Sequence, residues 1–345
     1  MPDLPAPGPH SLKRPILGIV LSALVVGSIA GPSFWLIRKD TPAPLPGPSR
    51  TAMPETAIRP GPLAPPEAPS PAPVLPPVPE RPSWRTASII VDGPLETSLV
   101  SVVGPTLGPS LTQVVTRTLV WWVDVPGGLQ RGDTLDVLFE ERAGEEPLVQ
   151  ALKFRSGRRA REYQAYRYQP PKHSFARYYT ADGLEVEERL SPSPIDTYEQ
   201  ITALLRDGRR HQGVDFKSPL GTPIKATFDG VITRRNWNFR SNGNCLEITE
   251  EKTGRKALYL HLEVLPTAMQ VGTPVRKGDI IAASGNSGRS FAPHLHYQLM
   301  SPEKPLDPFK IHRTHRIQLN DSERAALKAE IERVAKMWTH LAAAP

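Results

Sequence analysis

The sequence predicts a mainly β protein: a folded-over antiparallel β-sheet domain preceded by a β-rich domain, with an N-terminal transmembrane helix and a C-terminal helix. Short β-branched and aromatic runs alternate with Gly and Pro turns over residues 84–310. Residues 219–232 and 271–281 each combine a Gly-Thr-Pro turn, a β-branched strand and a second Gly turn, as a folded-over sheet requires. One run of bilayer length, Ile16–Ile37, is predominantly apolar and carries no charge.

This apolar run predicts a signal anchor over residues 15–37, after a cytoplasmic tail of residues 1–14. Lys13 and Arg14 stand just before it, as is typical of a cytoplasmic flank. A cleavable signal peptide is the alternative, because Ser28-Ile29-Ala30 places small residues at cleavage-like spacing. The anchor is favoured because the apolar run continues past that point. Either interpretation exports the rest of the chain.

The next segment, residues 38–83, is expected to be a Pro-rich linker. Almost every second or third residue after Thr41 is Pro, a composition that cannot build a hydrophobic core. In polyproline II geometry the segment would reach on the order of 130 Å. Such a tether suits a substrate that lies away from the bilayer, such as the cell wall; a Pro-rich ligand for a partner domain is the alternative.

Charge and cysteine content limit the partners and the means of stabilisation. The 345 residues carry a formal net charge of +7, which favours anionic partners such as lipid headgroups or wall polymers. No nucleic-acid-binding module accompanies this charge, so we expect no nucleic-acid partner. The single cysteine, Cys245, excludes an intramolecular disulfide and is expected to be a small buried residue.

Residues 84–200 predict a β-rich accessory domain. Most of its strand-like runs are separated by turn residues, and residues 98–115 are weakly helical. The predicted strands are 88–91, 119–123, 134–139, 151–154, 162–168 and 176–179. No cluster of acids, His or Cys suggests chemistry here, so we expect a regulatory or substrate-positioning role.

Five polar residues in the second unit, residues 201–310, form the candidate site. They are His211, Asp215, His261, His294 and His296. Gly and Pro residues after His211 exclude a helix, and in a strand residues two or four apart point to the same face. His211 and Asp215 can therefore converge, as can His294 and His296. The set predicts a catalytic zinc site with spare histidines for proton transfer, and spacing alone does not choose between His294 and His296 as the ligand.

Three further features complete this interpretation. Tyr259 is expected to share the polar face with His261. The Gly-Thr-Pro repeat also occurs in biotinyl and lipoyl carrier barrels, but no Lys stands at the hairpin tip that a carrier needs. Residues 311–345 form a helical extension, in which Asn320 and Glu323 fit a capping box and an apolar stripe is expected to pack on the protein.

Three ordered motifs within residues 209–309 resemble those of the lysostaphin-like zinc metallopeptidases that cut peptidoglycan cross-links. The motifs are His211-Gln-Gly-Val-Asp215, Tyr259-Leu-His-Leu262 and Gly285-Asn-Ser-Gly-Arg-Ser-Phe-Ala-Pro-His-Leu-His296. More weakly, Trp122-Val-Asp-Val, Arg131-Gly-Asp and Tyr179-Thr-Ala-Asp-Gly-Leu resemble the accessory domain of Gram-negative murein DD-endopeptidases. Phe291-Ala292 departs from the Thr-Gly common before Pro-His, which implies an altered substrate groove.

The resemblance implies residue roles within the site. His211, Asp215 and His296 would be the Zn²⁺ ligands, and His261 and His294 the catalytic histidines. Residues 201–310 would then be the metallopeptidase domain.

Asn242 and Asn244, near a turn, are candidate substrate contacts, although turn chemistry also explains them.

The expected function is that of a zinc endopeptidase, in particular a DD-endopeptidase, that hydrolyses cross-linking peptides in peptidoglycan. The protein would be a single-pass inner-membrane protein with periplasmic domains, or would be secreted to the periplasm if the N-terminal segment is cleaved. Besides peptidoglycan, proteins of the cell wall machinery are possible partners. A non-catalytic or autoinhibited regulator that binds and activates another cell wall hydrolase is the alternative, and a protease acting on a Gly-rich protein is a weaker one.

Overall fold

The computed structural model describes residues 83–205 and 211–343. The predicted cytoplasmic tail and signal anchor, and the predicted linker as far as residue 82, lie outside the described residues. Among the residues that are described, no helix is long and apolar enough to cross a membrane. The prediction of a mainly β protein with a C-terminal helix is confirmed for this part of the chain.

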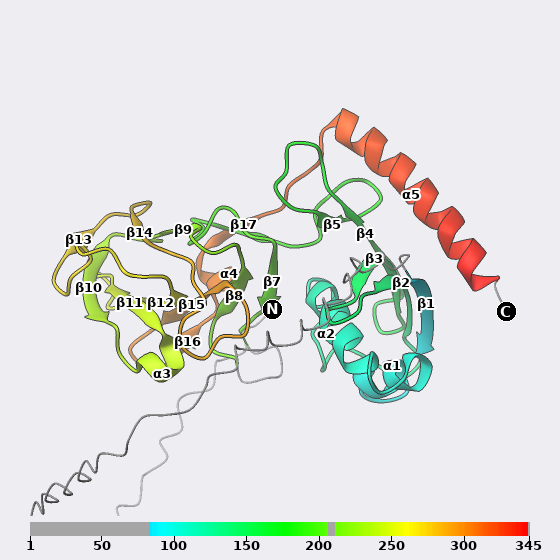
Figure 1. The fold of residues 1–345 in the computed structure, drawn as a ribbon, viewed down its shortest axis with the longest axis horizontal. Helices are drawn as coiled ribbons and strands as arrows, with labels where there is room; N and C mark the ends of the chain where they lie inside the picture. The colour runs from blue at the N-terminus through cyan, green and yellow to red at the C-terminus, as the bar shows by residue number, and fades with distance from the viewer. Residues whose placement is uncertain (1–82, 206–210, 344–345) are drawn as a thin grey trace, which may run out of the picture. The chain divides into compact units, whose positions relative to one another are not determined.

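The accessory domain is a five-stranded antiparallel sheet with two helices on one face (Figure 1). The helices α1 (Leu95–Val103) and α2 (Gly108–Leu119) bury apolar side chains against β1 and β3. The strands, in their order across the sheet, are β1 (Ser83–Ile90), β2 (Thr134–Glu141), β3 (Leu148–Ser156), β4 (Arg161–Tyr168) and β5 (Arg177–Tyr179).

One predicted strand of this domain, residues 119–123, is wrong. Leu119 is the last residue of α2, and the residues after it form a turn. The amphipathic pattern of α2 decides the structure, because it buries Leu111, Val115 and Leu119 completely. In the turn that follows, Trp122 and Val123 are buried in the core of the accessory domain, so strand propensity is overridden by tertiary packing.

The second domain is built on an antiparallel sheet in the order β13-β10-β11-β12-β15-β8-β7, with β16 paired to β15. The two Gly-Thr-Pro segments pair with each other, β9 with β14 and β10 with β13, as a folded-over sheet requires. The strands are β7 (Gln200–Ala203), β8 (Val214–Lys217), β9 (Pro223–Lys225), β10 (Gly230–Arg235), β11 (Asn244–Thr249), β12 (Lys256–Leu262), β13 (Pro274–Val275), β14 (Ile280–Ala283), β15 (His294–Met300) and β16 (Pro305–Leu306).

Shorter elements connect these parts. The helices α3 (Phe239–Asn242) and α4 (Pro308–Ile311) each span a single turn, and β6 (Arg189–Ser191) pairs with β17 (Arg313–His315). Trp121, just after α2, packs edge to face on Phe309 with ring centroids 5.3 Å apart. An aromatic side chain of the accessory domain therefore contacts the core of the second domain.

The C-terminal helix α5 (Asp321–Ala342) is the predicted capped amphipathic helix. The Asn320 side chain accepts from the Glu323 N–H, and the Glu323 carboxylate accepts from the Asn320 N–H. Leu327 and Val334 are fully buried against the face of the accessory sheet that α1 and α2 leave free. The prediction that the apolar stripe packs on the protein is confirmed.

Candidate metal centre

Two neighbouring strands set the position of the centre. Val214 and Phe216 of β8 are buried in the core, so Asp215 between them points to the opposite face. β15 pairs with β8 in a register that places His296 opposite Asp215. A distance of 2.8 Å separates His296 Nδ1 from Asp215 Oδ1.

His211 completes a compact triangle of ligand atoms. Its Nε2 lies 3.1 Å from Asp215 Oδ1 and 3.1 Å from His296 Nδ1. Ligand atoms at about 2.0–2.2 Å from a tetrahedral zinc ion lie about 3.3 Å from one another, and two His with one carboxylate are typical of catalytic zinc sites. The three residues therefore fit a zinc ion, and the predicted convergence of His211, Asp215 and His296 is confirmed.

Gly213 allows this close approach. A Cβ atom added there would lie 2.6 Å from the Tyr297 carbonyl oxygen and 2.7 Å from His296 Nε2. Real Cβ contacts of this length are essentially never seen. The glycine of the His-x-Gly-x-Asp motif is therefore needed because the ring of a ligand passes directly over it.

Partners behind the ligands orient the two imidazoles. The Leu204 carbonyl lies 3.3 Å from His211 Nδ1, and Gln298 Oε1 lies 3.4 Å from His296 Nε2. These contacts favour a proton on the outer nitrogen of each ring and leave the inner nitrogen free to bind a metal. Gln298 was missed from the sequence, although its place two residues after His296 on one strand face was a usable signal.

Asp215 is ionised in this setting. Burial opposes ionisation, but the interactions of the carboxylate with the His211 and His296 rings outweigh it and hold the pKa of the Asp215 carboxyl far below its usual range. The carboxylate is therefore an anionic ligand at neutral pH.

His261 reaches the site through an unusual backbone conformation. Its φ of 60° lies in the left-handed region, which non-Gly residues rarely adopt. The residue turns its ring toward the site, with its centroid 4.8 Å from that of His294. The predicted shared face with Tyr259 is wrong, because Tyr259 is fully buried on the other side, where its hydroxyl accepts from the Thr227 N–H.

The His261 ring is neutral at pH 7. Burial is the main cause that lowers its pKa to about 4; the Ser287 carbonyl opposes this lowering, and the nearby His294 and His296 add to it. Nδ1 lies 3.0 Å from the Ser287 carbonyl oxygen, which fixes Nδ1–H as the donor. The Nε2 lone pair is then free at neutral pH.

His294 lies next to His261 at the candidate metal centre. Its Nδ1 is 2.8 Å from the Ala292 carbonyl oxygen, and its Nε2 is 4.0 Å from Asp215 Oδ1. The Ala292 carbonyl fixes Nδ1–H as a donor, so Nε2 faces the triangle. The structure thus brings both predicted spare histidines beside the metal ligands.

A glycine-rich loop supports the two histidines from behind. Ser287 Oγ donates to the Leu262 carbonyl and accepts from the Asn244 N–H. At Gly288 a Cβ would lie 2.2 Å from the Gly243 nitrogen, so this loop packs directly on the turn after α3. Ser287 was not singled out from the sequence because its role depends on this contact.

The predicted substrate contacts Asn242 and Asn244 lie at this same support. The Asn242 side chain donates to the Trp237 carbonyl, which is the turn role that was the alternative explanation. Asn244 begins β11 and is half-buried. Their contact with substrate stays a prediction.

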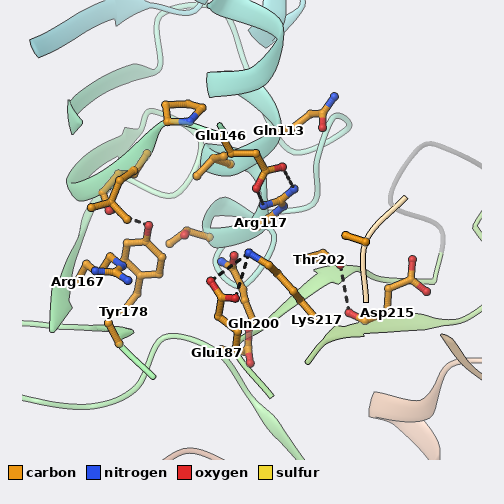
Figure 2. Close-up of a pocket in the computed structure, with 18 of the residues that line it drawn as sticks. Gln113, Arg117, Glu146, Arg167, Tyr178, Glu187, Gln200, Thr202, Asp215 and Lys217 are labelled. Atoms are coloured by element: carbon orange, nitrogen blue, oxygen red, sulfur yellow. Dashed lines mark hydrogen bonds and ion pairs between the residues drawn. The ribbon is translucent and has the colours of Figure 1, made fainter. Parts of the chain in front are cut away.

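The centre opens into a groove of about 790 Å³ (Figure 2). Asp215 and His294 line one part of it, and α2, β4 and β5 of the accessory domain line another. Phe291, which departs from the expected Thr, is 97% exposed and stands on the rim.

Comparison with known proteins gives one family match and several relatives. Residues 209–308 match the model described as Peptidase family M23. The chain is 31% identical over 197 residues to peptidoglycan DD-endopeptidase ShyA of Vibrio cholerae, which covers 53% of this chain and 43% of ShyA. It is 29% identical over 245 residues to ShyB of the same organism, which covers 66% of this chain and 54% of ShyB. The chain spans about half the length of these curated relatives.

Two solved structures are also similar to parts of this chain. The catalytic domain of lysostaphin from Staphylococcus simulans is 33% identical, with a TM-score of 0.28; the match covers 36% of this chain and 90% of that domain. Helicobacter pylori Csd3 is 21% identical, with a TM-score of 0.35, over 75% of this chain and 69% of Csd3.

Proposed function

Because residues 209–308 match the model of Peptidase family M23, we propose that this chain is a zinc-dependent endopeptidase that hydrolyses cross-linking peptide bonds in peptidoglycan. The observation that carries the proposal is the triangle of His211, Asp215 and His296, which meets a groove and has two further histidines beside it. The names of the relatives support the substrate, since ShyA and ShyB are peptidoglycan DD-endopeptidases.

His211 Nε2, Asp215 Oδ1 and His296 Nδ1 would hold the zinc ion. When bound, zinc supplies a Lewis acid that lowers the pKa of water and polarises the scissile carbonyl. Asp215 contributes the one negative charge among the three ligands. The outer contacts of His211 and His296 keep both inner nitrogens unprotonated for this purpose.

His261 acts as the general base in this proposal. Its Nε2 takes the proton of the attacking water, because Nδ1 is already committed to the Ser287 carbonyl. A neutral imidazole is needed for this step, and burial keeps the ring neutral at pH 7. Once protonated, His261 can deliver the proton to the leaving amine.

His294 acts on the opposite side of the scissile bond. With Nδ1–H donated to the Ala292 carbonyl, the Nε2–H of the imidazolium form of His294 would be directed at the developing oxyanion. The 4.8 Å separation of the His261 and His294 rings leaves both within reach of one peptide group.

The location and domain roles belong to the same proposal. A tail over residues 1–14, an anchor over 15–37 and a linker over 38–83 would carry the folded part into the periplasm. Residues 84–200 would form a regulatory or substrate-positioning domain, residues 201–310 the peptidase domain and residues 311–345 a helical extension. The inner membrane and proteins of the cell wall machinery are the proposed partners beside peptidoglycan.

The test is digestion of intact peptidoglycan sacculi by residues 84–345, with and without a chelator, followed by mass analysis of the released muropeptides. Chelator-sensitive conversion of cross-linked dimers into monomers is the expected result. Unchanged dimers would refute the proposal, and stimulation of a separate amidase by the zinc-loaded protein would instead support the regulator that the sequence left as the alternative.

A further inference from the structure

The groove extends well beyond the metal centre. Figure 2 shows Asp215 at one end and Arg167 with Tyr178 at the other, with Arg117 and Lys217 between them. The metal end belongs to the peptidase domain. The far end belongs to the accessory sheet, and nothing in the proposed chemistry uses it.

Strand alternation explains why Arg167 points into the groove. On β4, Tyr163 and Ala165 face the helices of the accessory domain; Tyr163 stacks on Trp122 with centroids 5.1 Å apart, and Ala165 is fully buried. Arg167 is the next residue on that face, and it lines the groove. Tyr178 lies opposite it on β5, where the hydroxyl donates to the Val149 carbonyl.

Arg167 differs from the other Arg and Lys side chains of the groove in its ion pairing. Four of these are ion-paired, with nitrogen to oxygen distances of 2.6 Å for Arg117 with Glu146, 2.8 Å for Arg142 with Glu140, 2.8 Å for Arg177 with Glu187 and 3.0 Å for Lys217 with Glu199. Arg167 forms no ion pair with any carboxylate in residues 83–205 and 211–343, and it is only half-buried. A guanidinium in this situation is suited to bind a carboxylate through two parallel hydrogen bonds.

We propose that Arg167 is a substrate-binding residue that holds a free carboxylate of the peptide while the scissile bond lies at the metal centre. The inference rests on the proposed function, and it names the substrate class as an acidic peptide extended along the groove. Peptidoglycan stem peptides carry free carboxylates away from the cross-linking amide, so such a group is available. The accessory domain would then select the substrate in addition to supporting the fold.

The test compares Arg167→Met with a matched control, Arg161→Met, in the full zinc-loaded chain. Arg161 stands on the same face of the same strand but does not line the groove. Two cross-linked muropeptide dimers are used, one with free carboxylates and one with those carboxylates amidated. For the free dimer we expect Arg167→Met to raise KM about tenfold, with kcat changed less than twofold, and Arg167→Lys to fall between.

The amidated dimer separates binding from a structural effect. Wild type and Arg167→Met should cleave it with equal KM, and Arg161→Met should match wild type on both dimers. An unchanged KM for the free dimer, or an equal loss on both dimers, would overturn the role of Arg167.

Binding of the uncross-linked tetrapeptide, measured by calorimetry, decides the role without turnover. Tighter binding to wild type than to Arg167→Met, abolished by amidation, supports the proposal even if no dimer is cut, in which case the proposed hydrolysis alone fails. Equal binding to both proteins would overturn it.

Discussion

Gly213→Ala should damage the metal centre although it changes no ligand. The added Cβ would meet the Tyr297 carbonyl oxygen at 2.6 Å and His296 Nε2 at 2.7 Å, whereas ordinary contacts are 3.4–4 Å. The strands β8 and β15 must therefore separate by roughly 0.5–1 Å to relieve the overlap, a typical overpacking response. His296 would move away from Asp215, which now lies 2.8 Å from it.

Two magnitudes follow for this variant. Displacing one ligand by this amount should weaken zinc binding by about 10–100-fold, as is usual when the support of a ligand is lost. Overpacking of this kind costs about 1–3 kcal/mol, which corresponds to a melting temperature lower by roughly 2–10 °C for a chain of this size.

The assay is a zinc titration against a chromophoric chelator at a temperature at which every variant is folded, together with thermal unfolding. Gly93→Ala is the control, because a Cβ at Gly93 meets nothing within 4 Å. Zinc affinity of Gly213→Ala equal to that of wild type would refute the reasoning that this glycine exists to admit the ligand ring.

Three further predictions concern the site, the pH dependence and the C-terminal helix. His261→Ala should keep stoichiometric zinc and lose about 10²–10⁴-fold in turnover, whereas His211→Ala should lose both, as metal analysis beside a muropeptide assay would reveal. His312 Nε2 lies 2.9 Å from the Tyr297 hydroxyl, and burial lowers the pKa of His312 to about 4. The unfolded chain, with a His pKa of about 6.5, therefore binds more protons between pH 6.5 and 4, so the melting temperature should fall over that range, and His312→Gln should flatten the fall. Leu327→Ala removes a fully buried side chain from the face between α5 and the accessory sheet and should cost about 2–5 kcal/mol in denaturant unfolding.

Side-chain alternation predicted most of the centre, because it is a local property of each strand. Asp215 and His296 lie on one face since their neighbours are apolar and buried. Tyr259 was assigned to the wrong face because the same rule was applied through His261. There the φ of 60° interrupts the alternation of side chains along β12, and no residue pattern signals such a conformation in a histidine.

The groove could not be predicted from the sequence, because it requires two domains to meet. The residue patterns of β4 and β5 predicted these two strands, but they do not predict that Arg167 and Asp215 line the same groove. The misassigned strand at 119–123 also concealed the C-terminal end of α2, whose Arg117 forms part of the wall. Long-range contact, rather than local propensity, decides these features.

A buried charge cluster holds the wall of the groove in place. β7 is the edge strand of the peptidase sheet, and an exposed edge would invite pairing with another chain. Here the Glu187 carboxylate accepts from the Ile201 N–H on that edge, and it is ion-paired with the buried Arg177. Arg177 in turn donates to the Tyr198 carbonyl just before β7.

The cost of breaking this cluster limits how the groove can open. Moving β5 and Glu187 away from β7 would break the hydrogen bonds from the Ile201 N–H to Glu187 and from Arg177 to the Tyr198 carbonyl, and each such bond to a charged group contributes about 1.5–3 kcal/mol. At about 1.4 kcal/mol for each tenfold change in population, the separated form would stay below about 1%. The groove is therefore a fixed feature of the folded chain, so a substrate peptide must enter between walls that are already in place.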